Sequence, residues 1–347
     1  MALLEVKNLR VCFRTRKGIV RAVNDISFSL DAGKTLAIVG ESGSGKSVSA
    51  MSVLRLLDGN GYIESGEILF DEHETGRAVD LARLSEREMS KIRGNRISVI
   101  FQEPMTALNP VFTVKRQLIE PFLVHGGHTK KQAEIEAEKM LEAVRIPAPK
   151  RVLKEYPHQL SGGMRQRIMI AMALACQPKI LIADEPTTAL DVTIQAQILE
   201  LMRDLQKERG TAILFITHDL GVVNETADEV AVTYCGQIVE RAKRSALFGG
   251  RYSHPYTEGL LSSIPSLHKK KERLDCIAGS VPSPWELPKG CKFAPRCPYA
   301  TQKCIVKEPA LESVGNSASG HAVRCFYPEK EERKSDRHAE LVVRLRT

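Results

Sequence analysis

The segment Gly40–Ser47, with the sequence Gly-Glu-Ser-Gly-Ser-Gly-Lys-Ser, constrains the fold of this chain more than any other feature. It fits the P-loop pattern, in which glycines let backbone N–H groups turn toward phosphate oxygens. The apolar run Leu36–Val39 predicts a short buried strand before it, and Val48–Leu57 predicts a helix whose N-terminus faces the phosphates. In such a loop Lys46 reaches the β- and γ-phosphates and the Ser47 hydroxyl binds Mg²⁺. The sequence therefore predicts an α/β nucleotide-binding fold.

Two carboxylates follow the apolar run Ile180–Ala183. Asp184 would end a central strand and hold the Mg²⁺ shell, while Glu185, one residue further, would orient the attacking water. Strands often end in acidic turns, so this interpretation depends on the P-loop. His218 follows the apolar run Ile213–Ile216, and a histidine there can donate a hydrogen bond that holds the water and the carboxylate in place.

A second anion site is predicted at Ser161-Gly162-Gly163. Ser161 is a candidate N-cap for a helix over Met164–Cys176, and the two glycines would expose backbone N–H groups at its start. An ordinary glycine-rich helix entry is the alternative. Because the chain already has one P-loop, a second phosphate cradle suits the nucleotide of a neighbouring chain.

The remaining pattern divides the chain into regions. Residues 1 to about 85 alternate short apolar runs with turns, which predicts an antiparallel β patch. Residues from about 105 to 175 look mainly helical, with Lys130–Val144 the clearest helix, and the loop 104–114 would contact a membrane subunit. Strands at 180–184 and 213–217 enclose a predicted helix, and this β-α-β order predicts parallel strands.

Bulk composition adds limits on location and partners. No apolar run approaches the roughly 18 residues of a membrane span, and Met1–Val6 lacks a signal pattern, so we expect a cytosolic protein linked to membranes through partners. The net charge of +8 is spread along the chain. The dense basic run Lys269–Arg273 is interpreted as a solvated linker, with a lipid-facing role as the alternative.

Four of the eight cysteines, Cys291, Cys297, Cys304 and Cys325, crowd the C-terminal region. In a reducing cytosol such a cluster indicates a metal site. Five, six and twenty residues separate successive cysteines, wider than the tight pairs of structural zinc sites, and a proline after Cys297 is a feature of some iron–sulfur ligands. The spacing leaves iron–sulfur and zinc both open. His321 is a spare ligand or an exposed loop histidine.

The ordered set of motifs over residues 1 to about 250 resembles the nucleotide-binding subunit of an ABC transporter. The resemblance implies an α/β cassette with a mixed sheet core, an antiparallel β patch and a helical subdomain at about 105–175. It also implies head-to-tail dimers that sandwich two ATP molecules. In that family Glu185 is the catalytic carboxylate, His218 the switch, and Gln102 a sensor of the γ-phosphate and of the membrane subunit.

The resemblance also implies binding residues by position. Contacts to the partner's ATP or across the dimer interface would come from Ser161, Gly162, Gly163 and Asp191. Contacts to ATP and Mg²⁺ would come from Phe13, Gly40, Ser42, Gly43, Ser44, Gly45, Lys46, Ser47, Gln102 and Asp184. Two positions depart from the usual pattern: Phe13 replaces the commoner tyrosine, and Met164 replaces a glutamine.

The C-terminal pattern resembles a narrower branch. The segment Cys291–Ala300 with the two later cysteines, together with His254–Thr257 and Thr187–Thr193, is similar to ABC subunits for oligopeptide and dipeptide import. This implies a small, irregular Cys-rich extension at 251–330 with a [4Fe–4S] cluster on the four cysteines, zinc being the alternative. A charged tail at 331–347 would follow it.

The function implied is ATP hydrolysis that powers peptide import through a membrane permease. A nickel or other small-solute importer is the close alternative. A soluble ABC ATPase acting on nucleic acid or ribosomes fits less well, because the chain has one cassette and a short helical block. Expected partners are two permease subunits, a second ATPase subunit that is a paralogue or a copy of this chain, and an extracytoplasmic solute-binding protein. No nucleic acid is expected, and the chain would lie at the cytoplasmic face of the inner or plasma membrane.

Overall fold

The computed structural model describes residues 2–71, 78–103, 107–188, 191–264, 276–315 and 320–335. The chain divides into two units. Unit 1 contains residues 1–4, 30–35 and 70–216, and unit 2 contains residues 5–29, 36–69 and 217–347. The basic run Lys269–Arg273 and most of the predicted charged tail lie outside the described residues.

Unit 1 is built on parallel strands, of which those at 180–184 and 213–217 were predicted from their apolar runs. β7 (Ile180–Asp184) lies between β6 (Ile97–Ile100) and β8 (Ala212–Thr217), parallel to both. Every residue of β7 is buried, which fits a strand covered on both faces. Because the strands are parallel, the carboxyl end of β7 places Asp184 at the edge where ligands bind in such sheets.

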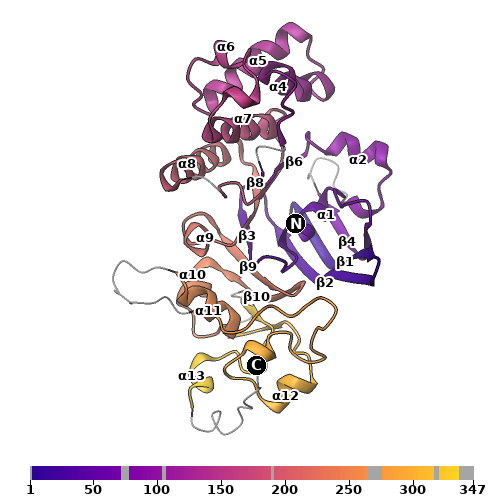
Figure 1. Ribbon diagram of the computed structural model, residues 1–347, viewed down its shortest axis with the longest axis vertical. Helices are drawn as coiled ribbons and strands as arrows, with labels where there is room; N and C mark the ends of the chain where they lie inside the picture. Colours follow the sequence, from indigo (N-terminus) through magenta and orange to yellow (C-terminus); the bar gives the residue numbers. More distant parts are fainter. Residues whose placement is uncertain are drawn as a thin grey trace. The chain divides into compact units, whose positions relative to one another are not determined.

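The helices of unit 1 follow their capping signals. Thr129 forms a capping box at the start of α5 (Lys130–Ala143). The buried side of α5 packs against helices α4, α6 and α7. The helix predicted over Lys130–Val144 is thus confirmed to within one residue. α4, α5, α6 and α7 lie together in Figure 1. The other elements are β5 (Val79–Asp80), η1 (Leu81–Arg83), α2 (Glu86–Ile92), α4 (Val114–Val124), α6 (Pro149–Val152), η2 (Pro157–Gln159), α7 (Gly162–Leu174) and α8 (Val192–Arg209).

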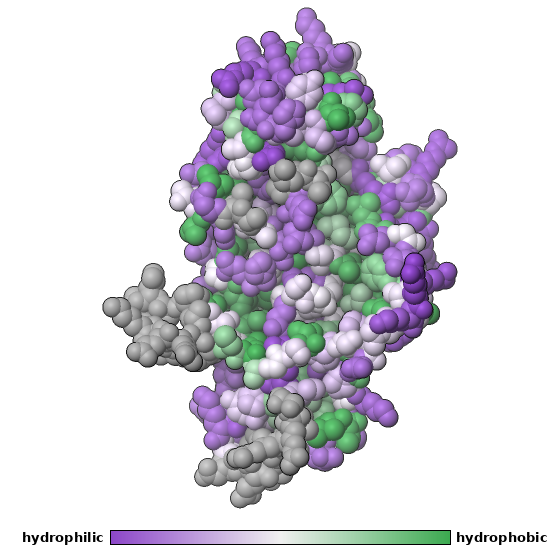
Figure 2. Space-filling view, in the orientation of Figure 1, coloured by the Kyte–Doolittle hydropathy of each residue, from purple (hydrophilic) through white to green (hydrophobic). Residues whose placement is uncertain are grey.

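One face of the helical part of unit 1 is mostly polar. In Figure 2 the face over α5 and α6 is mostly hydrophilic, as expected where charged side chains cover the outside of an amphipathic helix. Among the residues that the structure describes, no helix is both long enough and apolar enough to cross a membrane.

Unit 2 contains strands of two sheets. β1 (Leu4–Thr15, whose first residue is in unit 1) lies between β2 (Gly18–Leu30) and β4 (Gly61–Phe70). β3 (Thr35–Val39, with Thr35 in unit 1) is parallel to β9, which pairs antiparallel with β10, so the mixed sheet is confirmed. The remaining elements are α1 (Lys46–Val53), α9 (Leu220–Thr226), β9 (Glu229–Tyr234), β10 (Gln237–Lys243), α10 (Arg244–Gly249), α11 (Pro255–Ser262), η3 (Ala294–Arg296), α12 (Gln302–Val306), β11 (Glu312–Ser313), β12 (Ala322–Val323) and α13 (Lys330–Arg333).

The C-terminal segment, residues 276–335, shares a core with the strands of unit 2. β12 extends the sheet beyond β10, and β11 pairs with β12. Phe293 packs edge-on against Tyr234 at 5.3 Å between ring centroids and lies 5.5 Å from Tyr256. Aromatic rings from β9, α11 and the C-terminal segment therefore meet in one cluster, which anchors a segment that has little regular structure of its own.

Candidate functional site

The P-loop joins β3 to α1, as its sequence predicts. A Cβ atom at Gly40 would lie 2.3 Å from the Thr233 carbonyl oxygen, and one at Gly45 would lie 2.6 Å from the Ala22 carbonyl oxygen. Gly45 also has a φ of 94°, which side chains rarely adopt. α1 begins directly after it at Lys46, earlier than predicted, and ends near Arg55, whose positive φ cannot continue a helix. These two glycines are required by the close approach of neighbouring backbone.

The polar groups of the loop fit a phosphate ligand. Lys46 is 5% exposed, and its Nζ donates to the carbonyl oxygens of Gly40 at 2.8 Å and Glu41 at 3.0 Å. The Ser44 side chain is buried, with its Oγ 3.0 Å from Thr233 Oγ1. Ser42 and Gly43 are exposed. Ser47 is half-buried. A lysine held at the mouth of a glycine loop is the arrangement that receives phosphate oxygens. Ser47, at the start of α1, is the residue suited to Mg²⁺.

Phe13 lies in β1 and is half-buried. A Cβ atom added at Gly61 of β4 would come within 2.7 Å of Cε1 of the Phe13 ring, so the ring lies close to the Gly61 backbone. The adjacent Arg14 guanidinium lies 5.0 Å from the centroid of the Tyr62 ring. The surroundings of Phe13 leave it partly accessible for stacking.

Asp184 and Glu185 differ in their environment within unit 1. Asp184 is 5% exposed at the end of β7, whereas Glu185 is half-buried and has a φ of 45°. Such a conformation is strained for glutamate, and strain of this kind concentrates at functional sites. The backbone N–H of Glu185 donates to the Ile216 carbonyl at 2.9 Å, which ties the turn to β8.

The Glu185 carboxylate accepts hydrogen bonds from two neutral side chains of unit 1. Its Oε2 accepts hydrogen bonds from Gln102 Nε2 at 3.1 Å and from Thr188 Oγ1 at 3.0 Å. The structure thus brings together Gln102 and Glu185, which sequence analysis selected, and adds Thr188, which it missed as a site residue. Its position three residues after a strand-end carboxylate was the available signal.

The glycine-rich helix entry has the predicted cap. Ser161 precedes α7, and its Oγ accepts from the Met164 N–H at 3.3 Å. Gly162 and Ser161 are exposed, while a Cβ atom at Gly163 would lie 3.2 Å from Ile194 in α8. Asp191 is likewise an exposed N-cap, accepting from the Ile194 N–H at 2.9 Å. In this single chain both polar side chains therefore start helices.

His218 belongs to unit 2 and directly follows β8. It is exposed, and the next residue, Asp219, caps α9 by accepting from the Gly221 N–H at 2.8 Å. The cap fixes the backbone around His218 while its imidazole remains at the surface.

The prediction of a [4Fe–4S] cluster, or of zinc, on Cys291, Cys297, Cys304 and Cys325 was wrong. The four side chains do line one cavity, but its volume is only about 20 Å³, which suits about one water molecule. Within the described ranges, no group of three or more Cys, His, Asp and Glu side chains is arranged to hold a metal ion. The spacing of the four cysteines correctly predicted that they lie around one cavity, and incorrectly predicted that they bind a metal ion there.

The cysteines instead belong to the hydrophobic packing of the C-terminal segment. Cys291 and Cys297 pack on both core clusters there, and Cys304 packs against Ala294 and Ala300. Burial raises the pKa of the Cys291 thiol to about 12 and that of Cys325 to about 11, so both are neutral near pH 7.

His321 is also not the exposed loop histidine of the sequence interpretation. It is 4% exposed, and its Nε2 lies 2.9 Å from Oε1 of Glu240, which is fully buried in β10. The other oxygen of Glu240 accepts from the His254 N–H at 2.7 Å. This pair joins the C-terminal segment to the sheet.

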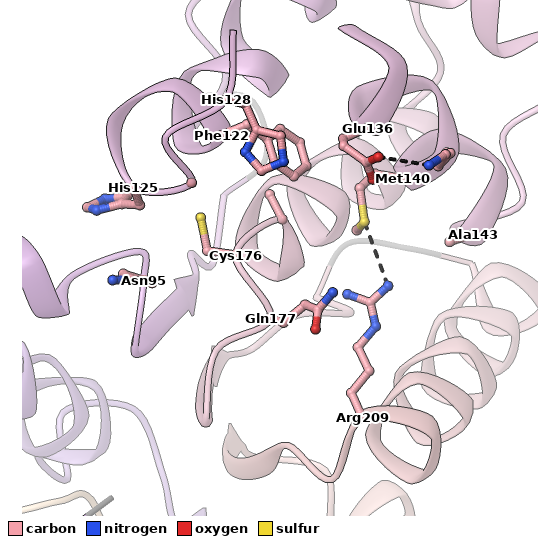
Figure 3. A pocket seen from close by; sticks show the side chains of 13 residues that line it. Asn95, Phe122, His125, His128, Glu136, Met140, Ala143, Cys176, Gln177 and Arg209 are labelled. Carbon is pink, nitrogen blue, oxygen red and sulfur yellow. Dashed lines mark hydrogen bonds and ion pairs between the residues drawn. The ribbon is translucent and has the colours of Figure 1, made fainter. Parts of the chain in front are cut away.

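One cavity of about 440 Å³ lies in unit 1 (Figure 3) and contains none of the predicted site residues. Its cationic side chains have partners: Lys139 is paired with Glu136 at 2.8 Å, and Arg209 donates to the Leu174 carbonyl and toward Met140 Sδ. We therefore assign it no role in nucleotide binding.

Comparison with known proteins identifies the family to which these nucleotide motifs belong. Residues 23–188 match the family described as ABC transporter, and residues 239–304 match that described as oligopeptide/dipeptide transporter, C-terminal region. The chain is 51% identical over 330 residues to the oligopeptide transport ATP-binding protein AppD of Bacillus subtilis, covering 95% of this chain and 98% of the relative. It is 47% identical to the dipeptide transport ATP-binding protein DppD of Escherichia coli, covering 94% and 97%. Neither name includes a metal group.

A solved structure shows the same fold. The dimeric post-hydrolysis state of the ATP-binding cassette MJ0796, bound to ADP and Pi, has a TM-score of 0.61 and 27% identity, covering 70% of this chain and 98% of that chain. The P-loop, the strand-end carboxylates and the capped glycine entry thus lie on an ABC cassette of the P-loop NTPase fold. This chain belongs to the family of ATP-binding proteins of oligopeptide and dipeptide ABC transporters.

Proposed function

We propose that this chain is the ATP-hydrolysing subunit that powers import of oligopeptides or dipeptides through a membrane permease. The observation that carries the proposal is the similarity to peptide-transport ATP-binding proteins along nearly the whole chain, including the C-terminal region. A cassette shared by all ABC transporters would support only ATP hydrolysis. The matched C-terminal region supports the peptide branch.

ATP and Mg²⁺ are the ligands for which the site is suited. The P-loop backbone and Lys46 would hold the phosphates, Ser47 and Asp184 would hold Mg²⁺, and Phe13 would stack on adenine. Lys46 already lies against the carbonyls of its own loop, so it needs only to turn its ammonium group toward the phosphates.

Glu185 is the proposed catalytic carboxylate. Its hydrogen bonds from Gln102 and Thr188 fix the direction of Oε2, and a carboxylate oriented in this way can polarise water as a general base. His218 would hold the same water and carboxylate geometry, and Gln102 would report the γ-phosphate to the membrane subunit. Ser161, Gly162, Gly163 and Asp191 would contact the ATP of a second ATPase subunit or the interface with it.

The proposed assembly follows from the peptide-transport family. It contains two permease subunits, a second ATPase subunit that is a paralogue or a copy, and a solute-binding protein outside the membrane. The chain would lie peripherally on the cytoplasmic face. We propose residues 1–250 as the nucleotide-binding domain, 251–330 as a Cys-rich extension and 331–347 as a charged tail.

The test is transport by cells that lack the gene for this chain. Uptake of labelled di- and tripeptides should be lost, and the wild-type chain should restore it while Glu185→Gln should not. Import of nickel is measured in the same cells. Loss of nickel uptake with normal peptide uptake would contradict the proposal and support the small-solute alternative.

A further inference from the structure

Glu41, the second residue of the P-loop, is held at three points within unit 2. Its N–H donates to the Tyr256 hydroxyl at 2.8 Å, and its carbonyl accepts from Lys46 Nζ at 3.0 Å. Its carboxylate accepts from both branches of the Arg296 guanidinium, with Nη1–Oε2 at 2.7 Å and Nη2–Oε1 at 3.1 Å. Both the backbone and the side chain of one loop residue are therefore fixed, and two of the three groups come from beyond residue 250.

Arg296 is itself held rigidly. Its side chain is 4% exposed, and its Nε donates to the Ala278 carbonyl at 3.1 Å. The guanidinium carbon lies 5.8 Å from the Tyr234 ring centroid and 5.9 Å from that of Phe293. A planar guanidinium fixed by a backbone carbonyl and two rings presents its fork to a carboxylate in one orientation.

Tyr256 is the second anchor and comes from another element. It is fully buried near the start of α11, with its ring centroid 4.7 Å from that of Tyr234. The His254 side chain caps α11, with Nδ1 accepting from the Tyr256 N–H at 3.1 Å. The hydroxyl that meets the P-loop is thus fixed by packing and by a helix cap.

The charge of Glu41 gives this arrangement a consequence for nucleotide binding. An unpaired carboxylate in a phosphate-binding loop would repel ATP, and the repulsion would be screened little because Glu41 is partly buried. Arg296 cancels that charge and also fixes the carboxylate by two bonds. A loop that is ordered before ATP arrives loses less conformational entropy on binding.

We infer that Arg296 and Tyr256 are positioning residues for ATP: they hold Glu41 and thereby keep the P-loop in its phosphate-binding conformation. This rests on the proposed binding of ATP by the P-loop and extends it, because it gives residues of the C-terminal region a part in nucleotide affinity. Neither residue needs to touch the nucleotide.

The first experiment measures the Kd of Mg-ATP, the KM and the kcat of the purified full-length chain and of Arg296→Gln. We expect Kd and KM to rise about tenfold, because a charged, bidentate hydrogen-bonded pair is lost, with kcat changed less. Arg324→Gln is the matched control. Arg324 lies in the same segment, is 13% exposed and donates to the Ile238 carbonyl at 3.0 Å.

A second variant isolates the role of charge. Adding Glu41→Gln to Arg296→Gln removes the stranded carboxylate, so ATP affinity should return to within about threefold of wild type. The loss caused by Arg296→Gln should be larger for ATP than for adenosine, since only the phosphates meet the negative charge. Failure of Glu41→Gln to restore affinity would overturn the inference, because Arg296 would then act on something other than Glu41.

Tyr256→Phe keeps the aromatic core and removes only the acceptor of the Glu41 N–H. ATP affinity should fall about threefold to tenfold, whereas Tyr327→Phe, which loses a hydroxyl near Thr301 in the same segment, should change it little. Unchanged ATP affinity in Arg296→Gln and Tyr256→Phe, with thermal stability lowered, would show that both residues only support the fold. Wild-type protein that fails to bind ATP would contradict the proposed function instead.

Discussion

Two glutamates lie in nucleotide motifs of this chain, one in each unit, and they are held in different ways. Glu185 in unit 1 accepts hydrogen bonds from a neutral amide and a neutral hydroxyl, both from residues near the surface. In Glu41 of unit 2, the carboxylate accepts hydrogen bonds from the buried Arg296 guanidinium, and the backbone N–H donates to the buried Tyr256 hydroxyl.

The difference separates two uses of one side chain. Hydrogen bonds from an amide and a hydroxyl orient the Glu185 carboxylate, as the proposed polarisation of water requires. A bidentate arginine cancels the charge and fixes the position, which suits a structural tie in an anion-binding loop. We therefore propose different roles for the two glutamates: water polarisation for Glu185 and positioning of the P-loop for Glu41.

The largest effect is expected at Glu185, the proposed catalytic carboxylate. Glu185→Gln should lower kcat about 100- to 1000-fold, equivalent to about 3–4 kcal/mol, because the amide cannot accept a proton from water. The Kd of Mg-ATP should stay near the wild-type value, and the ATP-bound dimer should become long-lived. Glu200→Gln, an exposed carboxylate on α8 in the same unit, is the control. Near-normal turnover by Glu185→Gln would contradict the catalytic role of Glu185 that distinguishes it from Glu41.

The next effect tests the packing that supports Arg296. Cys304 is 8% exposed and packs with Ala294 and Ala300. Cys304→Ser should lower the free energy of unfolding by about 2 kcal/mol, because a buried hydroxyl replaces a weakly polar thiol, and Cys304→Ala should cost less. Urea unfolding measures both. Equal or greater loss in the alanine variant would mean that the volume of the sulfur, and not its low polarity, determines the stability of this packing.

A smaller effect is expected at the donor that sequence analysis missed. Thr188→Val keeps the shape of the side chain and removes the hydroxyl that donates to Glu185. We expect kcat to fall about tenfold with an unchanged Kd for Mg-ATP, and Thr188→Ser to recover most of the rate. If Thr188→Val lowers ATP affinity and leaves kcat unchanged, Thr188 acts on ATP binding. The partners of Glu185 and those of Glu41 would then both serve nucleotide binding.

The contrast also explains what the sequence could and could not predict. Glu185 was predictable because its cues are local: an apolar strand, Asp184 beside it, and a P-loop earlier in the chain. Arg296 was not, since it meets Glu41 across 255 positions of sequence and sits in a segment without hydrophobic periodicity. Thr188 was missed because its spacing of three residues from Glu185 is a weak signal, which does not by itself place the hydroxyl on the carboxylate.

The elements of the fold were likewise predictable where their cues are local in the sequence. Strands β6, β7 and β8 and helix α5 were predictable from periodicity and caps, since those signals lie within each element. The four cysteines were misinterpreted because spacing can predict that side chains meet but not whether the cavity between them has room for a metal ion. Aromatic and alanine neighbours, drawn from the same segment and from β9 and α11, turned the group into a core.

The smallest effect is a loss of stability at alkaline pH that depends on Cys291. Burial raises the pKa of its thiol from the ordinary 9.0 to about 12 in the folded chain. The unfolded chain therefore releases this proton first, so the thiol's contribution to stability is complete below pH 9 and is lost as pH rises from 9 through 12. Between pH 9 and pH 10 the wild type should lose about 1 kcal/mol more than Cys291→Ala, which has no proton to release. Urea unfolding of both proteins at the two pH values measures the difference. An equal loss in both would show that the Cys291 thiol titrates alike in the folded and unfolded chains.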